Sequence, residues 1–228
     1  MTETIESLFI YIATYSPALP VVLFLIFSLL FGQVSKNRIL TLAIAYSTVE
    51  FLVNFTTFWV SAKFTRIMYS FFTAVEFTFF SYIFYLLIRD KFSRKVVVYL
   101  SIAFFVFWAS YKILVRDKIL DSIPIGVETI LILLFCFRFL YEQMDKVEDG
   151  FIYNRFSFWI AAGIMLYLAG SFFCYLFANQ VDVKTRNVFW MFQNIFATLK
   201  CIFISLSILV FQNQFASKVR MRAPRLTF

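Results

Sequence analysis

Four ionisable side chains lie inside long apolar stretches of this sequence, and they are the residues best able to do chemistry. Lys200 falls near the middle of the last apolar stretch, residues 188–211, and Glu50, Glu76 and Glu128 fall in three others. A charged side chain at the centre of a bilayer costs about 2.5–3.5 kcal/mol on insertion scales, so such residues require partners. We therefore expect Lys200 to pair with a glutamate, and Glu50 at a similar depth is the predicted partner.

Polar side chains recur at helical spacing around these residues. Intervals of three or four residues place them along one face of a helix. The stripes are Ser47, Glu50, Asn54, Thr57 and Ser61; then Tyr69, Thr73 and Glu76; then Asn194, Thr198, Cys201 and Ser205, with Gln193 and Lys200 on the adjacent face. We predict a polar pocket in the outer half of a helix bundle. Its ligand-binding or proton-binding residues are expected to be Glu50, Asn54, Glu76, Glu128, Gln193, Asn194 and Lys200.

Two interpretations of this cluster stay open. In the first, one acid pairs with Lys200, the other acids are protonated and hydrogen-bonded, and the network fixes helix packing. In the second, the cluster is a site whose acids titrate or bind a cationic or polyhydroxy ligand.

Two glycines predict where helices pack closely. Gly163 and Gly170 are seven residues apart, so both lie on one face of a helix. The adjacent face of that helix, with Tyr167, Ser171 and Cys174, is expected to line the pocket.

The composition identifies an integral membrane protein. The 228 residues are 62% hydrophobic and 22% aromatic, and the mean hydropathy is +0.83, well above the values of soluble domains. The chain has no histidine, which excludes Ser-His-Asp catalysis and histidine metal ligands. Its three cysteines lie in apolar runs without a CxxC spacing, so neither a disulfide framework nor a metal site is expected. We attribute the net charge of +8 to loops flanking the spans rather than to nucleic-acid binding.

Apolar runs of about 20 residues predict an all-α, polytopic bundle of seven transmembrane helices in a single domain. The spans are expected at residues 16–32, 39–60, 68–88, 96–115, 122–141, 156–177 and 188–211, followed by a basic cytoplasmic tail at 212–228. We expect Ser16 to cap the first span and Pro17 to lie in its first turn. The apolar residues before them either extend that helix beyond a proline kink or lie at the interface.

The distribution of basic residues predicts the orientation. Thirteen lysines and arginines follow the first, third, fifth and seventh spans, and seven follow the others. Because basic residues concentrate on the cytoplasmic side, the N-terminus is expected outside and the C-terminus in the cytoplasm. The basic tail is then an anchor at anionic lipid headgroups, or alternatively a docking segment for a cytoplasmic protein.

Four segments resemble a known group of proteins. They are AVEFTFFSY at 74–82, GVETILIL at 126–133, FWIAAGIMLYLAG at 158–170 and FQNIFATLK at 192–200. In these segments the chain resembles small seven-helix inner-membrane proteins of the Bacteroidota type. The resemblance implies a multi-pass protein of the bacterial inner membrane, and it implies no activity for any residue.

A lysine in the seventh helix is also a feature of the microbial rhodopsins, which carry retinal on it as a Schiff base. Those proteins place an acid four residues before the lysine, where this chain has Phe196, and their tryptophan-rich pocket is echoed only by Trp159 and Tyr167. We therefore expect no cofactor and keep retinal on Lys200 as a minor alternative.

The leading functional prediction is a sensory or signalling module that binds a small ligand in the outer pocket and acts through a separate cytoplasmic partner. A proton-coupled or cation-coupled transporter using the same acids is the main alternative, although no internal repeat is visible. A lipid-modifying intramembrane enzyme ranks lower, because the chain has no histidine and no GxSxG or HExxH motif. No catalytic residue is assigned.

Overall fold

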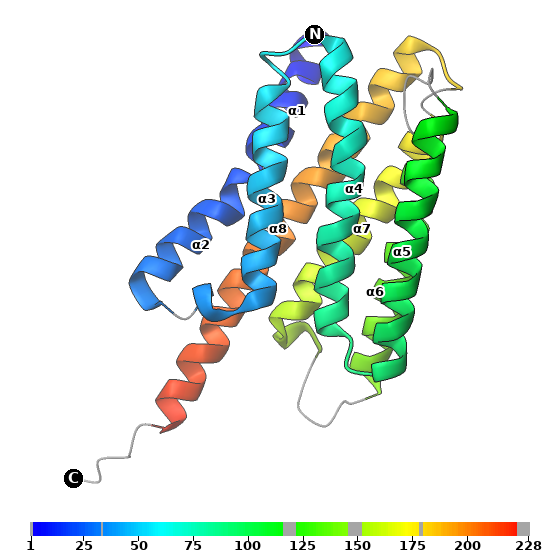
Figure 1. Cartoon of the computed structure of the whole chain (residues 1–228). Helices are drawn as coiled ribbons and strands as arrows, with labels where there is room; N and C mark the ends of the chain where they lie inside the picture. Colours follow the sequence, from blue (N-terminus) through cyan, green and yellow to red (C-terminus); the bar gives the residue numbers. More distant parts are fainter. Residues whose placement is uncertain (1, 33, 116–121, 146–151, 178–179, 223–228) are drawn as a thin grey trace, which may run out of the picture.

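The computed structural model describes residues 2–32, 34–115, 122–145, 152–177 and 180–222, and no strand occurs among them. Eight α-helices and two short 3-10 helices account for most of these residues. Their bounds are α1 Thr2–Tyr15, α2 Ala18–Phe31, η1 Val34–Lys36, α3 Arg38–Thr56, α4 Ala62–Leu87, α5 Lys91–Leu114, α6 Ser122–Met144, η3 Ile152–Asn154, α7 Phe156–Phe177 and α8 Val183–Arg222. Figure 1 shows the long helices side by side in one bundle.

Seven helical segments in the described part of the chain are long and apolar enough to cross a membrane, as predicted. The first of them, Ser7–Leu30, begins well before the predicted residue 16 and combines α1 with α2. The break between the two helices falls at Ser16 and Pro17 because proline has no backbone N–H to continue the helix. Apolar sequence on both sides lets the helix resume, so the first span bends instead of starting at the proline (Figure 1).

The predicted cap at this break was wrong. Ser16 donates its hydroxyl proton to the carbonyl of Ala13 at 3.1 Å, in the preceding helix, and the residue that caps α2 is Pro17, which provides no side-chain hydrogen bond. At the other end of α2, Gly32 adopts a left-handed conformation with φ of 64°, and its N–H bonds to the carbonyl of Ser28. Glycine adopts this conformation without steric cost, so the chain can turn here toward α3.

The last helix differs most from its prediction. α8 extends over 40 residues from Val183 to Arg222, whereas the predicted span ended at residue 211 and the rest was assigned to a tail. Neither glycine nor proline occurs between these bounds, so nothing breaks the helix before Pro224. At 1.5 Å per residue α8 is about 60 Å long, roughly twice a bilayer core. Its C-terminal part therefore projects beyond the bundle (Figure 1); residues 223–228 of the predicted tail lie outside the described residues.

Helices α7 and α8 pack closely because two glycines face α8. A methyl group at Gly163 would lie 2.7 Å from Cβ of Phe203, and one at Gly170 would lie 2.5 Å from the ring of Phe196. The predicted role of both glycines in helix packing is confirmed. Their contacts bring the middle of α8, with Lys200, against the middle of α7.

Buried side chains separate by type along the bundle. In the half that includes the start of α3 and the end of α4, the buried residues are mainly apolar. Examples are Phe80, Phe84, Phe139, Ile164 and Ile208, which belong to one continuous hydrophobic cluster. The buried ionisable residues Glu50, Glu76, Glu128 and Lys200 lie nearer the opposite half. The four buried ionisable residues therefore lie next to a packed apolar core that fills the other half of the bundle.

An aspartate that the sequence analysis did not identify fixes the start of α5. Asp90 accepts hydrogen bonds from the backbone N–H of Ser93 at 2.8 Å and from its hydroxyl at 2.7 Å. Arg138 of α6 donates to the same hydroxyl at 2.7 Å, and its guanidinium lies 3.5 Å from Asp90. This cap begins α5 at Lys91, five residues before the predicted start of the span.

We expect Asp90 to give the protein a small acid sensitivity. Its hydrogen bonds from Ser93 lower the pKa of Asp90 from 3.8 to about 2. Because the folded-state pKa is lowered, the stabilisation is complete above pH 3.8 and is lost as the pH falls through about 2. The Asp90 side chain is 42% exposed, so solvent screening keeps the effect small. Thermal unfolding between pH 5 and pH 2 should therefore depend less on pH in Asp90→Asn, which retains a capping oxygen, and equal slopes would contradict the assignment.

Candidate functional site

Lys200 lies at the centre of a buried network that joins three helices. Its Nζ donates a hydrogen bond to Glu50 Oε1 at 2.8 Å and another to the Tyr46 hydroxyl oxygen at 2.5 Å. The Tyr46 hydroxyl in turn donates to Glu76 Oε1 at 2.6 Å, and this oxygen is 3.9 Å from Nζ. The predicted pairing of Lys200 with Glu50 is confirmed, and Glu76 joins the same ion-pair group. The lysine side chain has no exposed surface.

Two aromatic rings complete the surroundings of the ammonium group. Nζ lies 3.8 Å from the ring centroid of Tyr167 on α7 and 4.7 Å from that of Tyr46 on α3. A cation over the face of an aromatic ring is attracted by the ring quadrupole, and the attraction is larger where water is excluded. The ammonium is therefore held by carboxylates, a hydroxyl and ring faces from α3, α4 and α7.

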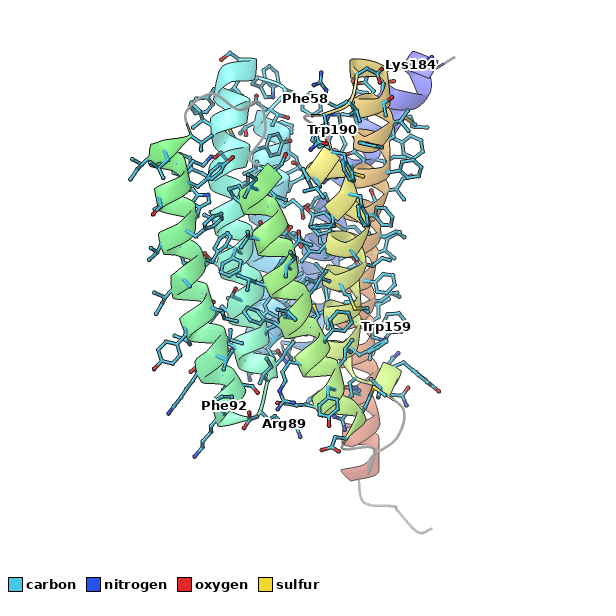
Figure 2. All side chains as sticks on the ribbon, turned by 90° about the vertical axis from the view of Figure 1, so that its right-hand side faces the viewer. Phe58, Arg89, Phe92, Trp159, Lys184 and Trp190 are labelled. Atoms are coloured by element: carbon cyan, nitrogen blue, oxygen red, sulfur yellow. The ribbon has the colours of Figure 1, made fainter. Side chains whose placement is uncertain are left out.

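A cavity of about 860 Å³ lies directly above this network. It reaches from Glu50 and Glu76 to Phe58 and Trp190, which Figure 2 places at one end of the bundle, opposite Arg89 and Phe92. We call this end, marked by Phe58 and Trp190, the mouth of the cavity. Helices α1, α3, α4, α5, α6, α7 and α8 all contribute to its walls. A volume of this size is typical of small-molecule sites.

Six of the seven predicted site residues line the cavity: Glu50, Asn54, Glu76, Glu128, Gln193 and Asn194. Lys200 does not line it but lies below, hydrogen-bonded to Glu50. From the predicted faces, Thr57, Tyr69, Thr73, Tyr167 and Ser171 also line the cavity. The structure thus brings the predicted residues into one site.

Several residues of the predicted polar stripes are instead used within their own helices. Ser47 donates to the carbonyl of Ala43 at 3.0 Å, and Ser205 donates to that of Cys201 at 2.8 Å. Such bonds to the preceding turn satisfy a hydroxyl without a neighbouring helix. Cys174, Thr198 and Ser61 are likewise absent from the cavity wall. Each predicted helix face therefore borders the cavity along only part of its helix.

Two important tyrosines were not assigned to the site by the sequence analysis. Tyr46 bridges Lys200 and Glu76, and Tyr175 accepts a hydrogen bond from Gln193 Nε2 at 2.9 Å. Tyr46 lies four residues before Glu50, and Tyr175 lies four residues after Ser171, so each shares a helix face with a residue of the predicted site. That spacing is the signal that identifies them.

The cavity carries hydrogen-bond acceptors without donors. Within the described residues, Glu128 Oε1 and Glu50 Oε2 are buried and have no hydrogen-bond partner. No three acidic, cysteine or histidine side chains of those residues are arranged to hold a metal ion. An acceptor buried without a donor costs free energy. These carboxylates therefore favour a ligand that supplies hydrogen-bond donors or positive charge.

The chain matches no protein-family model, no curated protein and no solved structure. The function is therefore inferred from the cavity and its charges, and the resemblance to Bacteroidota-type inner-membrane proteins stays a prediction. For the retinal alternative, a covalent ligand on Lys200 would displace the contacts of Nζ with Glu50 and Tyr46.

Proposed function

We propose that the protein is a membrane-embedded sensory module that binds a small ligand in the cavity and passes a helix movement to a separate partner at the opposite end. The observation that carries this proposal is a cavity of about 860 Å³ bordered by three buried glutamates. Buried ionisable residues in a membrane are costly and are characteristic of functional sites.

The apolar core below the cavity favours a receptor over a conduit. Phe80, Phe84, Phe139, Ile164 and Ile208 are almost fully buried in that half of the bundle. Within the described residues, these apolar side chains occupy the interior of the bundle beneath the Lys200 network. An apolar barrier at this place favours a ligand that enters and leaves at the mouth over one that crosses the bundle.

Helix α8 is the element best placed to transmit binding. It carries Gln193 and Asn194 in the cavity wall, Lys200 in the network below, and then extends beyond the bundle. It packs against α1, α2, α3 and α7. A ligand that shifts α8 by an ångström or two at the cavity moves its projecting end by a similar amount, because packed helices move as rigid elements.

The proposed orientation places the cavity mouth outside and the end of α8 in the cytoplasm of a bacterial inner membrane. Basic loops support this orientation. Arg89, Arg94 and Arg138 lie at the end remote from the mouth, where Asp90 and Glu142 bind Arg138. The cytoplasmic partner would contact this surface and the projecting part of α8.

A proton-coupled or cation-coupled transporter is the second candidate. It is favoured by the same acidic cavity, because carboxylates that bind cations from one side are a requirement of such carriers. A transporter would have to separate the apolar side chains beneath Lys200 during its cycle. Flux of the bound compound into proteoliposomes is expected only for this candidate.

A cavity-filling variant tests the proposed function. In nanodiscs, a library of small polar and cationic compounds should contain members that raise the melting temperature of the wild type. Thr57→Trp at the cavity wall, just after the end of α3, should abolish these shifts, whereas Thr41→Trp, exposed near the start of α3 and outside the cavity, should retain them. Compounds that bind should also slow amide hydrogen exchange in α8 beyond residue 204.

Two results would contradict the proposal. Equal shifts in both tryptophan variants would place binding outside the cavity. Flux of the bound compounds in proteoliposomes would replace the sensor with the transporter.

A further inference from the structure

Glu128 is the group in the cavity whose charge is least compensated. Its side chain lines the cavity, only 1% of the residue is exposed, and Oε1 has no hydrogen-bond partner among the described residues. In the same part of the chain, the ion pairs of Lys200 are with Glu50 and Glu76. An ionised carboxylate buried without a partner is costly. A cation that enters the cavity would remove this cost.

Charged groups around the cavity leave room for one added cation. Among the described residues, the ionised side chains of the lining are those of Glu50, Glu76, Glu128 and Lys112. Lys112 is in the last turn of α5, whereas Glu128 lies deeper, in the second turn of α6. Lys200, below the cavity, forms ion pairs with Glu50 and Glu76. The deep end of the cavity is therefore acidic.

The contacts of Lys200 indicate which chemical group the deep end of the cavity can bind. A primary ammonium, that of Lys200, is bound there by a carboxylate at 2.8 Å and a tyrosine hydroxyl at 2.5 Å, with the Tyr167 ring 3.8 Å away. Hydrogen bonds between an ammonium and a carboxylate are roughly twice as strong as neutral ones. Tyr167 also borders the cavity, so the same kinds of group are available to a second ammonium beside Glu128.

Several aromatic side chains line the cavity between Glu128 and the mouth. Tyr175 and Trp190 pack edge to face with their centroids 5.6 Å apart, and Phe58 lies at the rim. Such rings bind an apolar body and attract its positive end. A ligand with an ammonium at one end and a hydrocarbon or aromatic body at the other matches both parts of the cavity.

We propose that the cavity binds a small protonated primary amine, with its ammonium on Glu128 and its apolar body against the aromatic rings toward the mouth. This assignment rests on the proposed ligand-binding function and specifies the class of ligand. A metal ion fits less well because no three acidic, cysteine or histidine side chains among the described residues come together to hold one. A neutral alcohol offers a weaker donor to the carboxylate and cannot compensate its charge.

The test uses matched probes on the full chain in nanodiscs at pH 7. Benzylamine, 2-phenylethylamine and tryptamine are titrated by calorimetry, with 2-phenylethanol as the neutral control. At least one amine should bind at least about 10-fold more tightly than 2-phenylethanol, because a hydrogen bond to a charged group is lost with the alcohol. Glu128→Gln should weaken binding of that amine by about 10- to 100-fold.

A control variant separates the site from a general effect of charge. Glu142 lies on the same helix, fourteen residues after Glu128 and at the opposite end. Glu142→Gln should leave amine binding unchanged. The melting temperature of ligand-free Glu128→Gln should equal or exceed that of the wild type, since glutamine keeps the shape of the side chain and cannot carry a charge that is costly to bury. Loss of binding in a folded variant then reports on the site.

The amine assignment is overturned if none of the three amines binds, if 2-phenylethanol binds as tightly as they do, or if Glu128→Gln binds them as the wild type does. Failure of the receptor function is a separate result. If other compounds bind and Thr57→Trp abolishes their binding, the cavity is a ligand site, and only the assignment of an amine as its ligand is rejected.

Discussion

Replacing Lys200 with methionine is expected to lower the free energy of unfolding by about 3–5 kcal/mol, the usual cost of removing one partner from a buried ion pair. Methionine retains much of the volume of lysine, so the loss is mainly electrostatic. It leaves Glu50 Oε1, now 2.8 Å from Nζ, without a donor, and it removes the cation near Glu76. Unfolding in mixed detergent micelles, followed by circular dichroism, measures the change.

A second substitution identifies the cause of this loss. Glu50→Gln in the Lys200→Met background removes the stranded charge while keeping the shape of the side chain. The double variant should recover at least half of the lost stability, because an uncompensated charge costs more than a neutral polar pair. Glu76 keeps its hydrogen bond from Tyr46 in both variants.

The control is a lysine of the same helix in a solvent-exposed position. Lys184 is exposed near the start of α8, at the mouth end of the bundle (Figure 2). Lys184→Met should change the stability by no more than about 0.5 kcal/mol. A similar small change for Lys200→Met, or no recovery in the double variant, would show that the ion pair does not stabilise the fold.

Residue type and spacing predicted the spans and most of the site, for clear physical reasons. Long apolar runs must cross the bilayer as helices, and an ammonium buried among them requires an anion at the same depth. Glu50 is the anion that pairs with Lys200. The cavity could be predicted from three helix faces because each face has a polar residue every three or four positions.

Features that depend on neighbouring helices were harder to predict. The position of Tyr46, four residues before Glu50, places it on the face of the predicted site. The bridge that its hydroxyl makes depends on how α3 packs against α4 and α8. Asp90 lies in a charged loop, where its contact with Arg138 of α6 cannot be inferred from local sequence. Some helix ends also differ from the predicted ones. Helix α3 ends at Thr56 instead of residue 60, and α6 ends at Met144 instead of residue 141.

The close approach of α7 and α8 leads to the second large effect. Gly163→Ala is expected to destabilise the protein by about 1–3 kcal/mol, as overpacking does in tightly packed cores. The new methyl group would lie 2.7 Å from Cβ of Phe203 and 3.4 Å from the carbonyl oxygen of Lys200. Neither atom can move without the backbone of α8. The strain would therefore reach the segment of α8 that holds Lys200 in its network.

Gly126→Ala on α6 is the matched control, because its methyl group would meet only Phe172 Cε2 at an ordinary 3.8 Å. It should be neutral or stabilising, since alanine is a better helix former than glycine by up to about 1 kcal/mol. The measurement is the same unfolding titration in mixed micelles. Equal stabilities of the two alanine variants would show that α7 and α8 are not in close contact at Gly163.

Gly170→Ala distinguishes a clash with a backbone from a clash with a side chain. Its methyl group would lie 2.5 Å from Cγ, Cδ1 and Cε1 of Phe196, all of which lie beyond Cβ and can be moved by rotation about χ1 or removed by truncation. Gly170→Ala should therefore cost much less stability in a Phe196→Ala background than in the wild type. Phe203→Leu should not restore Gly163→Ala, because leucine keeps the Cβ atom that causes the clash. Rescue in both pairs would mean that α8 can shift away from α7, and that the Lys200 network, rather than the glycine contacts, sets the distance between the two helices.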